Sequence, residues 1–335
     1  MKIIIATGIY PPDIGGPAQY AKNLKAEFEG LGHQVKVLTY QLEKKMPIGV
    51  RHLWFFLRCL LTFPRSDLVI ALDTFSVGLP AVMAAKIFGK KIIIRTGGDF
   101  LWEQFVERTG DLVLLKDFYQ TRLYKLNLKE KIVFKFSRWT ICNASRLIFS
   151  TDWQRKIWLP VYGFDEAKTI IVENYYGPKE LSFPPSEKNF LAGSRPLKWK
   201  NIARLEAAFN KTRIKNAKIV YDGTTKPFEK FMDKIVHCYA VILVSIGDIS
   251  PNLILDAIRH NKPFILTKET GFYDKLKDIG LFVDPENIDD IADKILYLAD
   301  EKNYVQCRKK IENFNFIHTW TQIADEFLVV CRNIK

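Results

Sequence analysis

The sequence has few of the residues that build metal centres and disulfide frameworks. Its 335 residues include five cysteines and five histidines, and neither type recurs at a metal-ligand spacing. An odd number of scattered cysteines fits reduced thiols, so we expect a cytoplasmic chain. Long hydrophobic runs are also missing: the most apolar one, Leu53–Phe63, contains Arg58 and is too short to span a bilayer. A strand is predicted at Lys2–Thr7, so we expect no signal peptide there.

The composition indicates a folded globular protein. Hydrophobic residues make up 48% of the chain and charged residues 26%, and the length predicts two domains. The formal net charge is +13, and most of this surplus lies in the first 180 residues. We therefore expect the first half to attract an anionic surface or substrate.

The most informative stretch is Ser245–Thr267. It reads as a loop that follows a buried strand, then a helix with Ser250 as N-cap and Pro251 at its first position, then a second strand. Such a unit places its loop at the carboxyl edge of a parallel sheet, where a helix N-terminus favours phosphate. Two carboxylates, Asp248 and Asp256, bracket the helix start and can accept hydrogen bonds from sugar or ribose hydroxyls. The stretch predicts a nucleotide-sugar pocket; the alternative is an ordinary strand–helix unit with an aspartate near the helix dipole.

The spacing of Asp248 and Asp256 resembles the donor-binding segment of GT-B glycosyltransferases of the retaining glycosyltransferase 4 type. That family has two glutamates separated by seven residues, where this chain has aspartates at the same spacing. Arg195 and Lys200 resemble the family's basic pair that grips the donor diphosphate. The Tyr-Pro-Pro stretch before Gly15 and Gly16 resembles the family's first loop, and it lacks the dinucleotide fingerprint Gly-x-Gly-x-x-Gly.

The resemblance implies an α/β fold of GT-B architecture, with two Rossmann-like domains facing a central cleft. We expect the N-terminal, acceptor-side domain at residues 1–176 and a Pro- and Gly-containing linker at 177–189. The nucleotide-sugar-binding domain follows at 190–318. A C-terminal helix at 319–335 is expected to pack back toward the N-terminal domain.

The implied activity is retaining, metal-independent transfer of a hexose from a nucleotide-sugar to a glycan or lipid-linked acceptor. The UDP- or GDP-linked sugar is a co-substrate, and no other cofactor is expected. In this assignment Arg195 and Lys200 bind the diphosphate, Asp248 the sugar hydroxyls and Asp256 the ribose. Backbone groups expected to line the phosphates belong to Gly15, Gly16, Ser250, Pro251, Asn252 and Leu253.

Asp99 is the expected polar group on the acceptor side, although it can equally cap the helix that follows it. Two other functions stay open on the sequence. One is a non-catalytic GT-B scaffold that binds nucleotide-sugars, and the other is a sugar-nucleotide epimerase of the same architecture.

The stretch Leu112–Arg146 combines eight basic residues with six aromatic ones and only two acids. This mixture favours binding to an anionic membrane surface, on the inner face of the cell membrane, or binding of an acceptor that carries phosphate. The alternative is a pair of ordinary helices with a solvated basic face. No nucleic-acid-binding motif accompanies the charges, so we expect no nucleic-acid partner.

Overall fold

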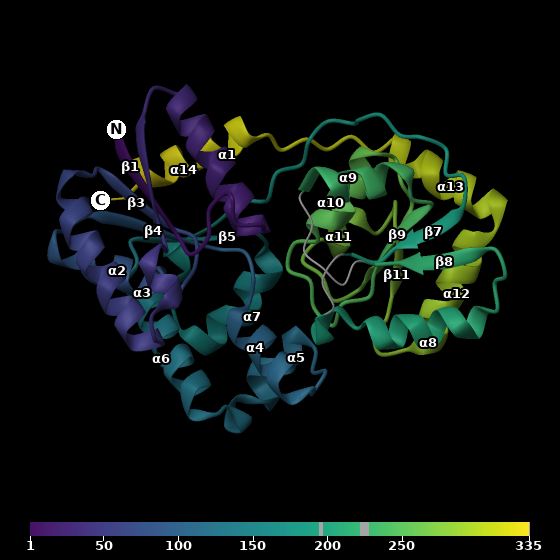
Figure 1. Ribbon diagram of the computed structural model, residues 1–335, viewed down its shortest axis with the longest axis horizontal. Coiled ribbons are helices and arrows are strands. Elements are labelled where there is room, and N and C mark those ends of the chain that lie inside the picture. Colours follow the sequence, from purple (N-terminus) through teal and green to yellow (C-terminus); the bar gives the residue numbers. More distant parts are fainter. Residues whose placement is uncertain (194–196, 222–227, 335) are drawn as a thin grey trace. The chain divides into compact units, whose positions relative to one another are not determined.

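The computed structural model describes residues 1–193, 197–221 and 228–334, the last range without the side chains of residues 228–230. The chain forms two compact units (Figure 1). The first comprises Met1–Leu101, Lys125–Tyr175 and the chain from His318 onward, and the second comprises Trp102–Tyr124 and Tyr176–Ile317. In the described residues, no helix has both the length and the apolar character needed to cross a bilayer.

The first unit is built on a parallel sheet of six strands. Their order is β2-β1-β3-β4-β5-β6, with bounds β1 (Lys2–Thr7), β2 (Gln34–Thr39), β3 (Leu68–Ala71), β4 (Lys91–Thr96), β5 (Arg146–Phe149) and β6 (Thr169–Ile171). The central strands are almost continuous runs of Ile, Leu, Val and Ala, as expected for strands that are buried on both faces.

Helices cover both faces of this sheet (Figure 1). On one face lie α1 (Gly16–Gly30) and α14 (Trp320–Arg332), which contact each other. On the other face lie α2 (Ile48–Thr62), α3 (Gly78–Ile87) and α6 (Leu128–Asn143). This unit also contains α7 (Asp152–Tyr162) and the short 3₁₀ turns η1 (Leu42–Lys45), η2 (Phe63–Arg65) and η4 (Glu166–Lys168). A further turn, η3 (Leu123–Lys125), contains the point at which the chain passes from the second unit back to the first.

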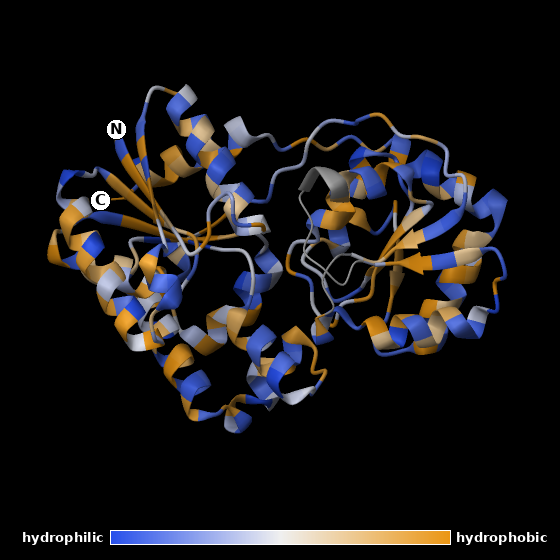
Figure 2. Cartoon of the chain, in the orientation of Figure 1, coloured by the Kyte–Doolittle hydropathy of each residue, from blue (hydrophilic) through white to orange (hydrophobic). Residues whose placement is uncertain are grey.

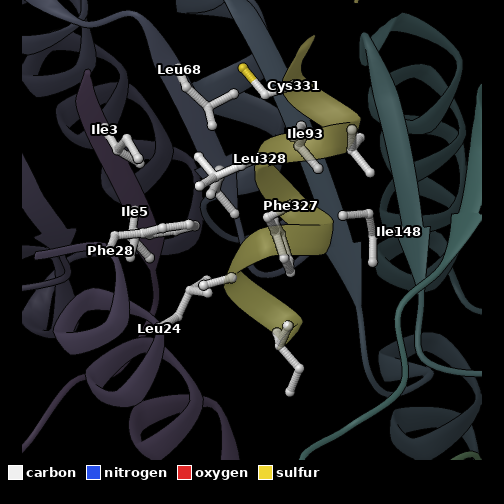
Figure 3. Close-up of a cluster of buried hydrophobic side chains, with 14 of the residues drawn as sticks. Ile3, Ile5, Leu24, Phe28, Leu68, Ile93, Ile148, Phe327, Leu328 and Cys331 are labelled. Carbon is white, nitrogen blue, oxygen red and sulfur yellow. The ribbon is translucent and has the colours of Figure 1, made fainter. Parts of the chain in front are cut away.

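The C-terminal helix is part of the core of the first unit (Figure 3). Phe327 and Leu328 of α14 pack against strand residues such as Ile3 and Ile148 and against Phe28 of α1. The rings of Phe327 and Phe28 meet edge to face, with centroids 6.5 Å apart. The last segment of the chain is therefore needed to close the first sheet on this face.

The second unit is built on a parallel sheet of five strands. Their order is β11-β10-β9-β7-β8, with bounds β7 (Lys188–Leu191), β8 (Ala217–Val220), β9 (Ala240–Leu243), β10 (Phe264–Thr267) and β11 (Leu281–Val283). One core contains residues from α10 (Asn252–Arg259), α11 (Tyr273–Leu276) and α9 (Phe228–His237). The other contains residues from α8 (Ile202–Thr212), α12 (Ile288–Ala299) and α13 (Glu301–Glu312).

Two helices of the second unit come from the first half of the chain. These are α4 (Phe100–Thr109), apart from its first two residues, and α5 (Leu115–Thr121). The sequence boundaries place this stretch in residues 1–176, whereas the structure groups Trp102–Tyr124 with the second sheet. The reason is packing, because its buried side chains contact the loops after β7 and β9, as described below.

Candidate functional site

The central site of the second unit lies at the carboxyl edge of its sheet, where β9 leads into α10. Strand β9 is flanked by β7 and β10 in parallel register, so the loops after all three strands lie at this edge. The sequence prediction of the helix start needs a correction. Pro251 is the N-cap and Asn252 the first helical residue, and no side chain caps the helix.

This later helix start determines which backbone N–H groups a ligand could reach. Pro251 has no N–H, and the N–H of Asn252 donates to the carbonyl of Ser250 at 2.9 Å. The N–H groups of Ile254 and Leu255 both donate to the Pro251 carbonyl. The amide of Leu253, the second residue of α10, has no acceptor one turn back in the helix and remains as a donor at this helix start.

Two of the predicted site residues, Lys200 and Asp248, meet at this edge. Lys200 ends the 3₁₀ turn η5 (Lys198–Lys200) after β7, and Asp248 lies in the loop after β9. The Lys200 ammonium lies 3.1 Å from Oδ2 of Asp248, and both side chains are largely buried. The same ammonium lies 4.1 Å from the ring centroid of Trp199. The cation and the carboxylate are thus placed together by two different strands.

The residue after Lys200 explains how the turn is held. Asn201 has a left-handed backbone with φ of 62°, a conformation that asparagine tolerates better than most residues. Its side-chain amide donates to the carbonyls of Val244, at 3.0 Å, and Pro285, at 2.8 Å. Asn201 therefore ties the chain after β7 to the ends of β9 and β11. Asn201 is not among the site residues that the sequence predicts.

The loop that carries Asp248 is also tied to the loop after β10. The N–H of Asp248 donates to the carbonyl of Glu269 at 2.9 Å, and residues 248 and 270 form a parallel bridge. The Glu269 carboxylate in turn accepts a hydrogen bond from Lys116 of α5 at 2.6 Å. This contact raises the pKa of Lys116 above its ordinary value. Glu269 is a carboxylate near the site that sequence reasoning missed, because no spacing pattern includes it.

The segment formed by α4 and α5 supports the loop after β9. The N–H of Leu115 donates to the carbonyl of Ile246, and the rings of Trp102 and Trp199 lie 5.7 Å apart. A Cβ atom on Gly247 would lie 2.7 Å from the Cβ of Leu115 and 3.1 Å from the Trp102 ring. Only glycine fits at this position, immediately before Asp248. The signal in the sequence is a glycine next to a candidate carboxylate.

The second predicted carboxylate, Asp256, has different partners. It lies in α10 and pairs with Arg259 of the same helix at 3.3 Å, and Arg259 also pairs with Glu180. Burial raises the pKa of the Asp256 carboxyl to about 7. The described contacts of Asp256 thus lead toward residue 180, in the segment before β7, and not to the Lys200–Asp248 pair.

The other predicted residues belong to the first unit or fall outside the described residues. Gly15 and Gly16 belong to the first unit, where Gly15 is the N-cap of α1 and a Cβ atom on Gly16 would meet open space. Asp99 is buried in the first unit, and its Oδ2 accepts a hydrogen bond from the Trp158 indole at 2.7 Å. Arg195 lies outside the described residues.

Comparison with known proteins gives matches by structure and not by sequence. No family model matches the chain, and no curated protein does. Among solved structures, sucrose-phosphate synthase from Thermosynechococcus elongatus has a TM-score of 0.75 at 12% identity, covering 99% of this chain and 98% of that one. Anabaena HepE in complex with UDP and glucose has a TM-score of 0.66 at 14% identity, covering 100% and 98%.

A third structure, the apo form of the lipopolysaccharide outer core galactosyltransferase WaaB, has a TM-score of 0.63 at 14% identity and covers 98% of this chain and 99% of that one. All three match the chain over nearly its full length. The chain therefore has the two-sheet, Rossmann-like α/β fold of GT-B glycosyltransferases, as the sequence predicts. At these identities the likeness establishes the fold alone.

Proposed function

We propose that the protein is a glycosyltransferase that transfers a hexose from a UDP- or GDP-linked sugar to a glycan or lipid-linked acceptor, with retention of configuration. The observation that carries the proposal is the Lys200–Asp248 pair at the carboxyl edge of the second sheet, beside the start of α10. Open α/β sheets bind ligands at this edge. A cation beside a carboxylate suits a donor that has both phosphates and hydroxyl groups.

In this proposal each group meets the part of the donor that its chemistry suits. The ammonium of Lys200 has three donor hydrogens, so it can keep its bond to Asp248 and also bind a diphosphate oxygen. Asp248 accepts hydrogen bonds from sugar hydroxyls, and Asp256 accepts them from the ribose. Arg195 adds a second cation to the diphosphate, while Gly15, Gly16 and the start of α10 offer backbone N–H groups.

The reaction needs positioning and charge stabilisation more than a protein nucleophile. As the glycosidic bond to the diphosphate breaks, negative charge grows on the leaving phosphate oxygen, and Lys200 and Arg195 stabilise it. That oxygen can then take the proton from the acceptor hydroxyl as the new glycosidic bond forms on the same face of the sugar. We propose that no metal ion is required. The UDP and glucose named for the HepE structure, and the galactosyl transfer named for WaaB, support a nucleotide-sugar donor.

A specific observation also favours the non-catalytic scaffold as a second candidate. Asp256 already has a cationic partner in Arg259, and an aspartate is one methylene shorter than the glutamate of the resembled family. A scaffold would bind the nucleotide-sugar at this edge and turn none of it over. Binding and turnover therefore have to be measured separately.

The decisive experiment is calorimetric titration of the protein with UDP and with GDP. We expect one of them to bind and the Lys200→Ala variant to lose about 10- to 100-fold in affinity, because a charge-assisted hydrogen bond is worth roughly 1.5–3 kcal/mol. Lys218→Ala is the matched control, since Lys218 pairs with Glu187 on the exposed surface of the same unit. The uncharged nucleoside should bind the wild type and both variants equally. Equal affinity of Lys200→Ala and wild type for the diphosphate would refute the site.

A further inference from the structure

Helix α2 is apolar on the side that faces solvent as well as on the side that faces the sheet. Phe55 and Cys59 point into the core. The opposite side exposes a stripe of large apolar residues at helical spacing, namely Val50, Leu53, Trp54, Leu57 and Leu61. Leu53 is 59% exposed and Leu61 is 85% exposed. A helix that only covered a sheet would carry polar residues along this stripe.

Helix α6 also exposes apolar residues, and in addition it buries polar ones. Its buried side includes three polar residues, Glu130, Ser137 and Thr140. Its exposed side presents large apolar residues three to four positions apart, namely Leu128, Ile132, Phe136 and Trp139. Leu128 is 76% exposed. The usual distribution of polar and apolar residues is thus partly inverted on this helix.

Helix α3 joins the two stripes into one surface. It lies next to α2 and next to α6, and it exposes Met83 and Ile87, the latter by 62%. Its Lys86 donates to Oδ1 of Asn143 at 2.5 Å, and the same ammonium lies 5.8 Å from the ring centroid of Trp139. We name the exposed sides of these three helices the α2–α3–α6 face. Figure 2 shows hydrophobic colouring along these helices of the first unit.

The charge on the α2–α3–α6 face has one sign. Helices α2 and α3 contain no acidic residue, and the single acid of α6, Glu130, is buried in the capping box that begins the helix. Exposed basic residues on these helices are Lys86, Lys129, Lys131, Lys135 and Arg138. Apolar side chains, interfacial tryptophans and unopposed cations are the combination by which proteins rest on a bilayer that contains anionic lipids.

We propose that the α2–α3–α6 face docks on an anionic lipid membrane, with its apolar stripes in the headgroup region and its lysines against lipid phosphates. A second copy of the chain fits less well, because a two-fold contact would place these cations against each other. The surface differs from the stretch Leu112–Arg146 that the sequence suggests. The part before Lys125 belongs to the second unit, where Lys116 and Arg122 are already paired with Glu269 and Asp111. The proposal goes beyond the transfer reaction and does not depend on it.

Co-sedimentation with vesicles tests the proposal. We expect the protein to bind vesicles of phosphatidylcholine mixed with phosphatidylglycerol at low salt, and to bind phosphatidylcholine alone much more weakly. Replacing Lys129, Lys131 and Lys135 together with Gln should weaken binding by roughly 10-fold or more. The same change at three exposed lysines of the second unit, Lys302, Lys309 and Lys310, is the charge-matched control and should leave binding unchanged.

A second variant separates the apolar contribution from the charge. Leu53→Ser combined with Leu61→Ser keeps the charge, and because both side chains are exposed we expect the unfolding temperature to stay close to the wild type. Binding of this double variant to the mixed vesicles should fall, and the binding that remains should be more sensitive to salt than that of the wild type. The proposal is wrong if the wild type does not bind the mixed vesicles at low salt. It is equally wrong if the protein forms a dimer in solution that this double variant abolishes, because a second copy would then cover the face.

Discussion

The two units share one architecture but place their polar chemistry differently. In the first unit the carboxylate singled out by the sequence, Asp99, is buried against Trp158, while three helices expose apolar and basic side chains. In the second unit charged groups gather at the carboxyl edge of the sheet, as the pairs Lys200–Asp248 and Lys116–Glu269. The proposed donor site thus lies in the second unit, and the proposed membrane surface lies in the first.

The boundary between the two units does not follow the order of the chain. The segment Trp102–Tyr124 leaves the first sheet after β4 and packs against the second unit before the chain returns to β5. Its residues Trp102 and Leu115 contact the loop that positions Asp248. The loop that carries Asp248 is therefore supported by side chains from the first half of the sequence.

The largest expected effect is that of Asp248→Asn on turnover. In the proposal, the Asp248 carboxylate holds the sugar hydroxyls while the bond to the diphosphate breaks. The neutral asparagine side chain should therefore lower the rate of transfer by about 100-fold and change the affinity for the nucleoside diphosphate far less. The measurement is release of diphosphate from the nucleotide-sugar that calorimetry selects. Asp274→Asn, at an exposed position of the same unit, should behave as wild type. If Asp248→Asn instead lowered the affinity for the nucleoside diphosphate and left the rate of transfer unchanged, Asp248 would act on diphosphate binding through Lys200 and not on the sugar.

The next effect concerns Gly247. In Gly247→Ala the added methyl group would overlap Leu115 and Trp102, so α4 and α5 must shift away from the loop. Overpacking of this kind costs about 1–3 kcal/mol of unfolding free energy. Because the Trp102 and Trp199 rings are neighbours, tryptophan fluorescence should change as well. A Cβ atom on Gly30 would meet open space, so Gly30→Ala is the control. An unchanged fluorescence and stability in Gly247→Ala would show that the segment does not support the loop.

Much of this arrangement could be predicted from sequence patterns because the strands are buried and nearly uniform in composition. Lys2–Thr7 is a sheet strand, as its apolar run predicts. The pairing of Lys200 with Asp248 follows from their places after two parallel strands. The grouping of Trp102–Tyr124 with the second sheet could not be predicted, because it depends on contacts such as Lys116–Glu269, between residues 153 positions apart in the sequence. The start of α10 was placed one residue early because Ser250 and Pro251 fit an N-terminal pattern that the backbone does not adopt.

The smallest expected effect is a pH dependence that arises from Asp256. Burial raises the pKa of this carboxyl to about 7 in the folded protein, while the unfolded chain releases the proton near 3.8. Between these values the folded state binds more protons than the unfolded state, so the free energy of unfolding falls as pH rises and levels off above about 7. Arg259 at 3.3 Å favours the carboxylate and offsets part of this effect.

We therefore expect the wild type to lose roughly 1–2 kcal/mol between about pH 5 and pH 7 relative to Asp256→Asn. Denaturant unfolding at several pH values measures this difference, and Asp278→Asn, at an exposed aspartate of the same unit, should keep the wild-type pH profile. If ionised Asp256 accepts hydrogen bonds from the ribose, the affinity for the nucleoside diphosphate should also rise through pH 7 in the wild type. The phosphate of the ligand titrates alike with both proteins, so the difference between them isolates Asp256. If the affinity for the nucleoside diphosphate depends on pH in the same way in the wild type and in Asp256→Asn, then Asp256 does not contact the ribose. Its role would then be limited to the ion pair with Arg259.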